Sequence, residues 1–208
     1  VNALIGRLIP DAGTASFMGQ SLIGRAPQAI NQMGVSRVFQ TPEIFGELTL
    51  LENVMIPALA HADGAFKANW WTSLRDRKAV REVAERELHD VGLKDKMHVV
   101  ADNLSRGDKR RLELAMCLSQ DPKLLLLDEP TAGMSRADTN EIIEVLKTIH
   151  AKGMTKVIIE HDMHVVVSLA SRISCMAQGH VIDEGSPEEI RNSPKVREAY
   201  LGDEADEH

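Results

Sequence analysis

The apolar residues at the start of the chain recur at intervals of three and four, the spacing of one helix face. Val1, Leu4, Ile5 and Leu8 follow this rule, which predicts an amphipathic helix that stops before Pro10. Further elements are expected in the same half of the chain: a strand and turn over 14–21, a short helix over 27–34, a strand over 35–40, a helix that Thr49 and Glu52 cap and Pro57 ends or kinks, and a long charged helix over 74–91.

The second half of the chain alternates apolar strands with capped helices. Strands are expected over 123–128 and 156–160, and a third over 172–182 that passes through Gln178 and Gly179. The helices between and after these strands are expected to start at serine or aspartate caps, namely Ser135, Asp162, Ser186 and Ser193. Four consecutive leucines in the first strand indicate that both of its faces are covered, which predicts an α/β fold with a parallel sheet.

The long charged helix does not fit this layer pattern, so we interpret the middle of the chain as a helical insertion. We expect residues 1–41 and 120–202 to form the sheet core, and residues 42–119 to form a helical subdomain between them. Residues 203–208 are acidic and are expected to form a frayed tail. In such a fold, ligands bind at the carboxyl ends of the strands.

Composition excludes several classes of protein. Hydrophobic residues make up 43% and charged residues 26% of the 208 positions, which is typical of a folded globular domain. The formal net charge of −7 argues against a broad nucleic-acid surface, so no nucleic-acid partner is expected. The longest aliphatic run, Leu124 to Leu127, is far too short to span a bilayer. The two cysteines, Cys117 and Cys175, lie in apolar stretches, which favours a reducing compartment without disulfides.

The strand over 123–128 delivers two adjacent carboxylates, Asp128 and Glu129, to its carboxyl end. Neighbouring residues on an extended chain point to opposite sides, so one carboxylate could serve a magnesium ion and the other an attacking water. Phosphoryl transfer requires both of these roles. For this dipeptide alone, a strand that simply ends in solvated acids is an equally good explanation.

A second candidate site lies at the start of the helix that follows Leu104. Ser105 and Asp108 have the spacing of a capping box, while Gly107 in the first turn costs about 1 kcal/mol of helix stability. Three basic residues over 109–111 follow beside the positive end of the helix dipole, an arrangement that favours anion binding. The alternative is an ordinary capped helix without a ligand.

Two further polar residues end expected strands. His161 closely follows the strand over 156–160, and its imidazole could contact a terminal phosphate or hold a catalytic water. Gln40 ends the strand over 35–40, and its amide could ligate a metal ion or orient water. Each signal is weak alone, because such residues are more often ordinary surface residues.

A phosphate-binding loop would complete this set, but the sequence holds no glycine followed by four residues and Gly-Lys-Ser or Gly-Lys-Thr. The nearest string, residues 19–26, lacks the lysine and the hydroxyl. The chain opens at Val1 rather than at methionine, without a signal-peptide pattern, so we expect that part of the protein precedes it.

Taken together and in this order, the motifs resemble those of the ATP-binding subunit of an ABC transporter. The resemblance extends over almost the whole chain, and five motifs in order are highly specific. They correspond to that family's Q-loop, signature motif, Walker B motif, D-loop and switch histidine: Gln40, Leu104-Ser105-Arg106-Gly107-Asp108, Leu125-Leu126-Leu127-Asp128-Glu129-Pro130, Ala132-Gly133-Met134-Ser135 and His161. The signature departs from the family pattern at Arg106, where the family has glycine.

The resemblance implies a P-loop NTPase-like fold that uses ATP and Mg²⁺ as cofactors. Asp128 would hold the magnesium shell, with Gln40 as a further candidate ligand that links nucleotide to the membrane partner. Glu129 would polarise the attacking water and His161 would sense the terminal phosphate. Ser105 and Gly107 would contact the ATP of an identical or homologous subunit in a head-to-tail dimer. Transmembrane permease subunits would be the partners, which places the chain at the cytoplasmic face of the inner membrane.

Other details resemble the branched-chain amino-acid importer subfamily, in particular Phe39-Gln40-Thr41-Pro42, Glu160-His161-Asp162-Met163 and the segment from Pro194 to Gly202. Urea import and lipopolysaccharide export remain alternatives for the transported substrate. In the family the Walker A loop would immediately precede Val1. We therefore expect the full protein to be an ATPase, whereas the 208 residues alone are better explained as a non-catalytic interaction module. A soluble ABC ATPase of DNA repair or translation is disfavoured by the acidic charge.

Overall fold

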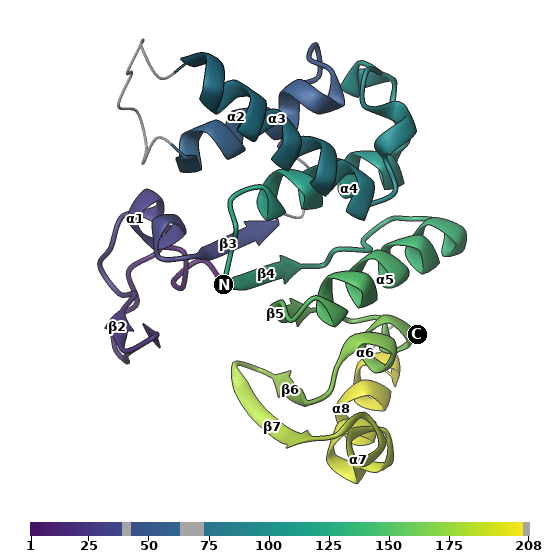
Figure 1. Ribbon diagram of the computed structural model, residues 1–208. Coiled ribbons are helices and arrows are strands. Elements are labelled where there is room, and N and C mark those ends of the chain that lie inside the picture. Colours follow the sequence, from purple (N-terminus) through teal and green to yellow (C-terminus); the bar gives the residue numbers. More distant parts are fainter. Residues whose placement is uncertain (39–42, 63–72, 206–208) are drawn as a thin grey trace. The chain divides into compact units, whose positions relative to one another are not determined.

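A computed structural model describes residues 1–38, 43–62 and 73–205 of the chain. These residues fall into two compact units, Val1–Ile159 and Glu160–His208, and each unit is described by itself (Figure 1). Within the described residues, no helix is both long enough and apolar enough to cross a membrane. The expected domain boundaries at residues 41, 119 and 202 stay a prediction.

The first unit combines short strands with a group of helices. Its elements are β1 (Ser16–Phe17), β2 (Gln20–Ser21), α1 (Pro27–Gln32), β3 (Val35–Val38), α2 (Leu50–Ala62), α3 (Ser73–Asp90), η1 (Lys94–Lys96), η2 (Ala101–Asn103), α4 (Arg106–Leu118), β4 (Leu124–Asp128), α5 (Arg136–Ala151) and β5 (Thr155–Ile159). Most of these elements confirm the sequence pattern, because apolar periodicity and capping residues determine where each one begins.

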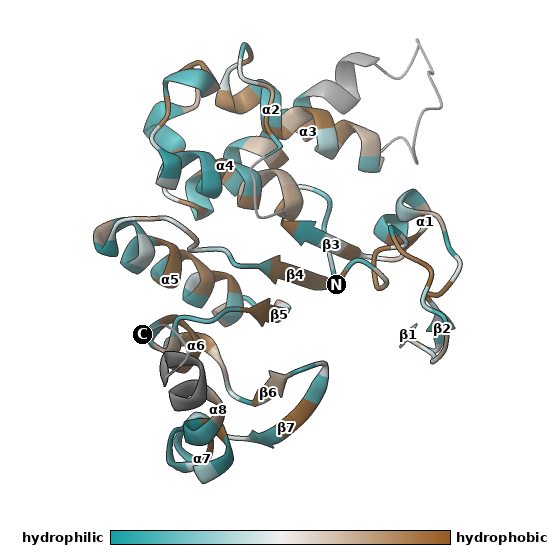
Figure 2. Ribbon diagram, turned by 180° about the vertical axis from the view of Figure 1, so that it is seen from behind, coloured by the Kyte–Doolittle hydropathy of each residue, from teal (hydrophilic) through white to brown (hydrophobic). Residues whose placement is uncertain are grey.

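A parallel sheet of three strands forms the centre of this unit, in the order β3-β4-β5. The middle strand is β4, whose Leu125, Leu126 and Leu127 are almost completely buried. Helix α5 runs beside β4 and β5, and the apolar colouring of β4 is visible in Figure 2. The prediction of a covered parallel strand over the leucine run is therefore confirmed.

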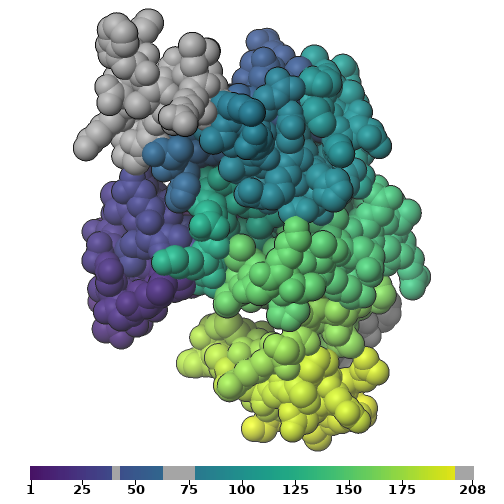
Figure 3. Space-filling view, in the orientation of Figure 1, coloured from purple at the N-terminus to yellow at the C-terminus, as the bar shows by residue number. Residues whose placement is uncertain are grey.

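Helices α2, α3 and α4 pack against one another, and blue and teal atoms from this part of the chain gather in one region of the space-filling view (Figure 3). Their shared core includes Leu88 and Leu112, which are fully buried. Of the two effects expected of Pro57, an end or a kink of the helix, the end is wrong, since α2 continues to Ala62. Proline removes one backbone donor, but buried Ala58 keeps the helix packed beyond that point.

The expected helix over the first eight residues is also wrong, because this segment forms turns. The amide of Leu4 donates to the carbonyl of Val1 at 2.8 Å, and Gly6 adopts φ of +73°, which no right-handed helix contains. A Cβ atom at Gly6 would lie 2.3 Å from the carbonyl oxygen of Arg25, so glycine is required by close packing there. Ile5 is nevertheless buried, as the apolar spacing predicted.

The part of the second unit that the structure describes, residues 160–205, contains two strands and three helices. Its elements are α6 (Met163–Leu169), β6 (Ile173–Ala177), β7 (His180–Gly185), α7 (Pro187–Asn192) and α8 (Pro194–Ala205). Strands β6 and β7 pair antiparallel, so the expectation of a single buried strand over 172–182 is corrected to a hairpin. The physical reason is the turn itself, because Gln178 and Gly179 both have positive φ, the geometry that reverses a chain tightly.

Candidate functional site

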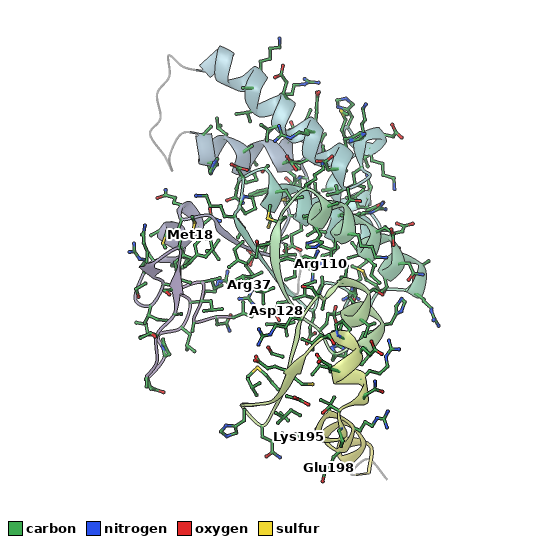
Figure 4. All side chains as sticks on the ribbon, turned by 60° about the horizontal axis from the view of Figure 1, so that its bottom comes forward. Met18, Arg37, Arg110, Asp128, Lys195 and Glu198 are labelled. Atoms are coloured by element: carbon green, nitrogen blue, oxygen red, sulfur yellow. The ribbon has the colours of Figure 1, made fainter. Side chains whose placement is uncertain are left out.

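Asp128 ends the central strand β4, and its carboxylate is held by an arginine of the neighbouring strand. Arg37 of β3 donates from Nη2 to Asp128 Oδ2 at 2.5 Å and from Nη1 to Asn2 Oδ1 at 2.7 Å. The Arg37 side chain is 10% exposed and that of Asp128 is 25% exposed. Figure 4 shows both side chains in the same region of the molecule. The predicted metal-binding carboxylate therefore lies at the edge of the sheet in an ion pair.

Glu129 follows directly, but its backbone leaves the extended conformation. Its φ is +45°, in the left-handed region that residues other than glycine rarely adopt. Its amide donates to the carbonyl of Ile159 at the end of β5 at 2.9 Å, and its carbonyl accepts from the amide of Ala132 at 3.1 Å. The strand alternation expected for Asp128 and Glu129 is thus wrong, because β4 ends at Asp128 and Glu129 begins a tight turn.

Arg110 of helix α4 donates to three consecutive carbonyl groups of this turn. Its Nε donates to the carbonyl oxygen of Pro130 at 2.9 Å, and its Nη2 donates to that of Glu129 at 3.0 Å and that of Asp128 at 3.4 Å. The remaining nitrogen, Nη1, lies 2.7 Å from Glu113 Oε2. The Arg110 and Glu113 side chains are 2% and 5% exposed, which makes this a buried ion pair.

The first turn of α4 carries the predicted signature residues. Ser105 is the N-cap, and its hydroxyl oxygen accepts from the amide of Asp108 at 3.1 Å. The Asp108 carboxylate does not complete the expected capping box, because it pairs with Lys96 and Arg111, each at 2.5 Å. Burial opposes ionisation of Asp108, but the hydrogen bond from Lys96 and the charges of Arg111 and Lys96 hold its pKa below the ordinary value.

Gly107 has a packing role that the sequence did not reveal. A Cβ atom there would lie 2.8 Å from Asp138 Oδ1 in the first turn of α5, so a larger residue would displace the Asp138 side chain. Arg106 donates to the carbonyl of Gly133 at 3.1 Å, in the segment that resembles the D-loop. The start of α4 therefore contacts the loop that follows Glu129, through the hydrogen bond between Arg106 and Gly133.

The other two predicted site residues are placed differently. Gln40 lies outside the described residues. His161 belongs to the second unit, where its Nδ1 lies 4.0 Å from Glu160 Oε2. The neighbouring Asp162 caps α6 by accepting from the amide of His164 at 2.8 Å, as the sequence predicted.

Magnesium chemistry fits the end of β4. Within the ranges that the structure describes, no three histidine, cysteine, aspartate or glutamate side chains gather into a metal cage. Proteins commonly bind Mg²⁺ through one or two carboxylates while substrate phosphates and water complete its shell. Asp128 supplies such a carboxylate at the edge where ligands of parallel sheets bind.

Sequence reasoning missed two residues of this site, Arg37 and Arg110. An arginine in a short buried strand requires a counter-charge, and the carboxylate of Asp128 on the next strand supplies it. In the sequence Arg110 belongs to a basic run that favours anion binding, but helical spacing places it on the face of buried Leu114 and Cys117. A charged residue on that face, followed three positions later by Glu113, is the signal that could have identified the buried pair.

Comparisons with known proteins identify the family of the chain. The family model described as "ABC transporter" matches residues 1–132, and the model "Branched-chain amino acid ATP-binding cassette transporter" matches residues 181–206. The high-affinity branched-chain amino acid transport ATP-binding protein LivG of Escherichia coli is 36% identical over 206 residues, covering 97% of this chain and 81% of LivG. The corresponding BraF protein of Pseudomonas aeruginosa is 33% identical, with the same coverage of both chains.

Solved structures give the same result. A nucleotide-free ATP-binding cassette from an ABC transporter has a TM-score of 0.78 and 30% identity, covering 96% of this chain and 81% of that chain. The ADP conformation of MJ1267, an ATP-binding cassette of an ABC transporter, has a TM-score of 0.79 and 28% identity, covering 97% and 81%. These matches confirm the expected P-loop NTPase-like fold. The chain belongs to the ABC ATPase family, in its branched-chain amino acid transport subfamily.

Proposed function

We propose that this chain is the ATP-hydrolysing subunit of an importer for branched-chain amino acids. The observation that carries the proposal is the pair of adjacent carboxylates at the end of β4, whose backbone is fixed by Ile159 and Arg110. The relatives named above are branched-chain amino acid transport proteins, which supports this substrate class. Transmembrane permease subunits would be its partners, at the cytoplasmic face of the inner membrane.

The two carboxylates have different tasks in this proposal. Asp128 would hold the magnesium ion, which when bound to ATP neutralises charge on the transferring phosphoryl group. Arg37 must then give up its contact with Asp128 Oδ2, or share the carboxylate through the other oxygen. Glu129 would accept a proton from the attacking water and orient it toward the terminal phosphate. Its fixed backbone lowers the cost of holding that orientation.

The remaining site residues fall into two groups: one would act on the nucleotide of this chain, and the other on the nucleotide of a second subunit. Gln40 would be a further magnesium ligand and a link to the permease, and His161 would donate to the terminal phosphate. Ser105 and Gly107 would contact the ATP of a second subunit, identical or homologous, in a head-to-tail dimer. The Ser105 oxygen accepts from Asp108, yet its hydroxyl hydrogen stays available to a phosphate oxygen.

The proposal predicts that Glu129→Gln lowers ATP turnover about a hundredfold or more, because glutamine cannot accept the proton of the attacking water. Nucleotide affinity should change little, since magnesium and phosphate contacts are assigned to other residues. Residues 1–208 hold no Gly-Lys-Ser or Gly-Lys-Thr loop. Phosphate release is therefore measured on the chain carrying such a loop ahead of Val1, and nucleotide affinity is measured with a fluorescent ATP analogue.

Glu144→Gln is the matched control, because Glu144 is an exposed glutamate on α5 that pairs with Lys147 at 2.9 Å. This variant should retain the turnover of the unsubstituted chain. Undiminished phosphate release by the Glu129 variant would remove Glu129 from the role of base. If the loop-bearing chain bound no nucleotide at all, the non-catalytic module would be the better description.

A further inference from the structure

We propose that Arg110 is a positioning residue that holds Asp128 and Glu129 in their working arrangement through main-chain carbonyl groups. The inference rests on the proposed function, in which these two carboxylates carry the chemistry. Arg110 acts through the turn after β4 and is assigned no contact with nucleotide. Figure 4 labels Arg110, Arg37 and Asp128 in one region of the molecule.

The geometry of the guanidinium group matches the turn. Two of its nitrogens, Nε and Nη2, share three successive acceptors, the carbonyl oxygens of Asp128, Glu129 and Pro130, at distances from 2.9 to 3.4 Å. The third nitrogen faces Glu113 at 2.7 Å. All three nitrogens therefore have hydrogen-bond acceptors, and the planar fork fixes the direction of each bond.

The burial of this pair indicates a positional role. Desolvation of a buried ion pair often outweighs the attraction between its charges, so apolar side chains in the same place can be equally stabilising. A buried pair that is fully hydrogen-bonded specifies one arrangement of the groups around it. Arg110 is 2% exposed and Glu113 is 5% exposed, so water does not compete for these bonds.

The turn requires such a restraint because Glu129 is strained. Its φ of +45° is disfavoured for every residue with a Cβ atom, and strained residues persist where their surroundings fix them. The Glu129 amide is held by Ile159 on β5, and its carbonyl is held by Arg110 and the amide of Ala132. Without the Arg110 hydrogen bonds, the backbone that follows the Glu129 carbonyl could relax toward an extended conformation.

The first test uses the 208-residue chain and measures amide hydrogen exchange by NMR in the variant Arg110→Lys. Lysine keeps the charge but offers a single nitrogen, which cannot reach the same set of acceptors as the guanidinium fork. We expect the amides of Glu129 and Ala132 to exchange at least about tenfold faster, because both belong to the held turn. Amides in the middle of α5 should keep their protection.

Arg111→Lys is the matched control, because it makes the same change one position later on the same helix. Arg111 contacts Asp108 and Glu141, at 2.5 and 3.0 Å, rather than the turn. Its variant should leave the exchange of the Glu129 and Ala132 amides unchanged. Should Arg110→Lys fail to fold, Glu113→Gln retains the arginine and loosens only its Nη1 anchor, with a smaller acceleration expected at the same two amides.

The second test measures catalysis in the loop-bearing chain. Arg110→Lys should lower kcat about 10- to 100-fold with nucleotide affinity within about twofold of the unsubstituted chain, since small displacements of catalytic groups cost rate rather than binding. Affinity would fall together with rate if the substitution merely unfolded part of the protein. The control for this test is Glu144→Gln, at an exposed position of α5, which should retain both values.

Unchanged exchange of both amides in Arg110→Lys would overturn the proposal. Accelerated exchange with an unchanged kcat would overturn it as well, because the held turn would then not matter for catalysis. Absence of turnover in the unsubstituted loop-bearing chain contradicts the proposed function instead. In that case the amide exchange still decides whether Arg110 holds the turn.

Discussion

Neighbouring charged residues on α4 bind different partners, because they lie on different faces of the helix. Arg110 lies on the buried face and binds main-chain carbonyls, whereas Arg111 pairs with the carboxylates of Asp108 and Glu141. Lys96 joins the same Asp108 carboxylate from η1. The basic run that suggests an anion site in the sequence is thus largely neutralised by contacts within the chain.

Asp108→Asn is expected to lower the free energy of unfolding by about 1–3 kcal/mol at pH 7, because an amide is a weaker partner for two cations. The pKa of Asp108 is lowered in the folded state, so its stabilisation is present above the ordinary value of 3.8 and is lost as pH falls toward the folded pKa. Urea unfolding at neutral and acidic pH measures this difference.

The wild type and the Asp108 variant should therefore differ at pH 7 and converge as the pH falls below 3.8. Asp95→Asn is the control, since Asp95 is an exposed aspartate on η1, close to Lys96 in the chain. A gap of constant size at every pH would contradict the assignment, because it would mean that the Asp108 carboxylate charge contributes nothing.

At this scale the sequence predicts residue types better than contacts. The position of Asp128 and Glu129 at the carboxyl end of β4 could be predicted, because the run of leucines before them fixes that strand. The partners Arg37 and Arg110 could not, since each is brought to the site by tertiary packing. Gly107 could be predicted only in part. The sequence shows that a glycine in the first turn of a helix is unusual, but it does not show the close contact with Asp138.

Elements are predicted well wherever a local signal fixes both ends. The cap at Ser135 and the full capping box between Ser186 and Glu189 form as expected, because these contacts lie within one helical turn. Errors occur where distant residues decide the outcome, as at Pro57 inside α2 and at Gly6 against Arg25. The β6–β7 hairpin was missed because its turn contains only one glycine and no asparagine.

That turn offers a test at the scale of the element. Gln178 has φ of +48° and Gly179 has φ of +80°, so asparagine at the first position should fit better than glutamine. Gln178→Asn is expected to stabilise the second unit by up to about 1 kcal/mol, a part of the roughly 1–2 kcal/mol that the left-handed conformation costs most residues with a Cβ atom. The midpoint of its urea transition, followed through the reactivity of Cys175 on β6, provides the measurement.

Gly179→Ala is the companion variant and should act in the opposite direction, by about 1 kcal/mol. A Cβ atom at Gly179 would meet no other atom within 4 Å, so its cost comes from the backbone conformation alone. Two variants that shift the midpoint in the same direction would contradict a turn with two positive φ angles.

For the whole molecule, the division into two units separates a large core from a small one. Among the described residues, the buried hydrophobic side chains of the second unit are Val165, Ile190 and Val196. All the others belong to the first unit, including the leucines of β4. Since apolar burial is the main source of stability, the first unit should resist denaturant better than the second.

The two cysteines allow this difference to be measured, because each unit contains one. Cys117 is buried on α4, where burial raises its pKa and its thiol donates to the carbonyl of Arg37 at 3.4 Å. Cys175 is half-buried on β6, and burial together with the charge of Asp183 raises its pKa less strongly. The chain is alkylated briefly at increasing urea concentrations. Peptide mass spectrometry then gives the alkylated fraction of each cysteine in one sample, and no substitution is needed.

Cys175 should become fully reactive at a urea concentration roughly 1 M lower than Cys117, because the smaller core of its unit opens first. Cys117 should stay unreactive until the helices packed on α4 separate, since a thiol buried there is neither accessible nor ionised. Coincident midpoints would contradict this order and would show that the two units unfold as one cooperative block. Where the two midpoints are separate, a shift of only the Cys117 midpoint on adding nucleotide would assign the binding energy to the unit that carries Asp128 and Glu129.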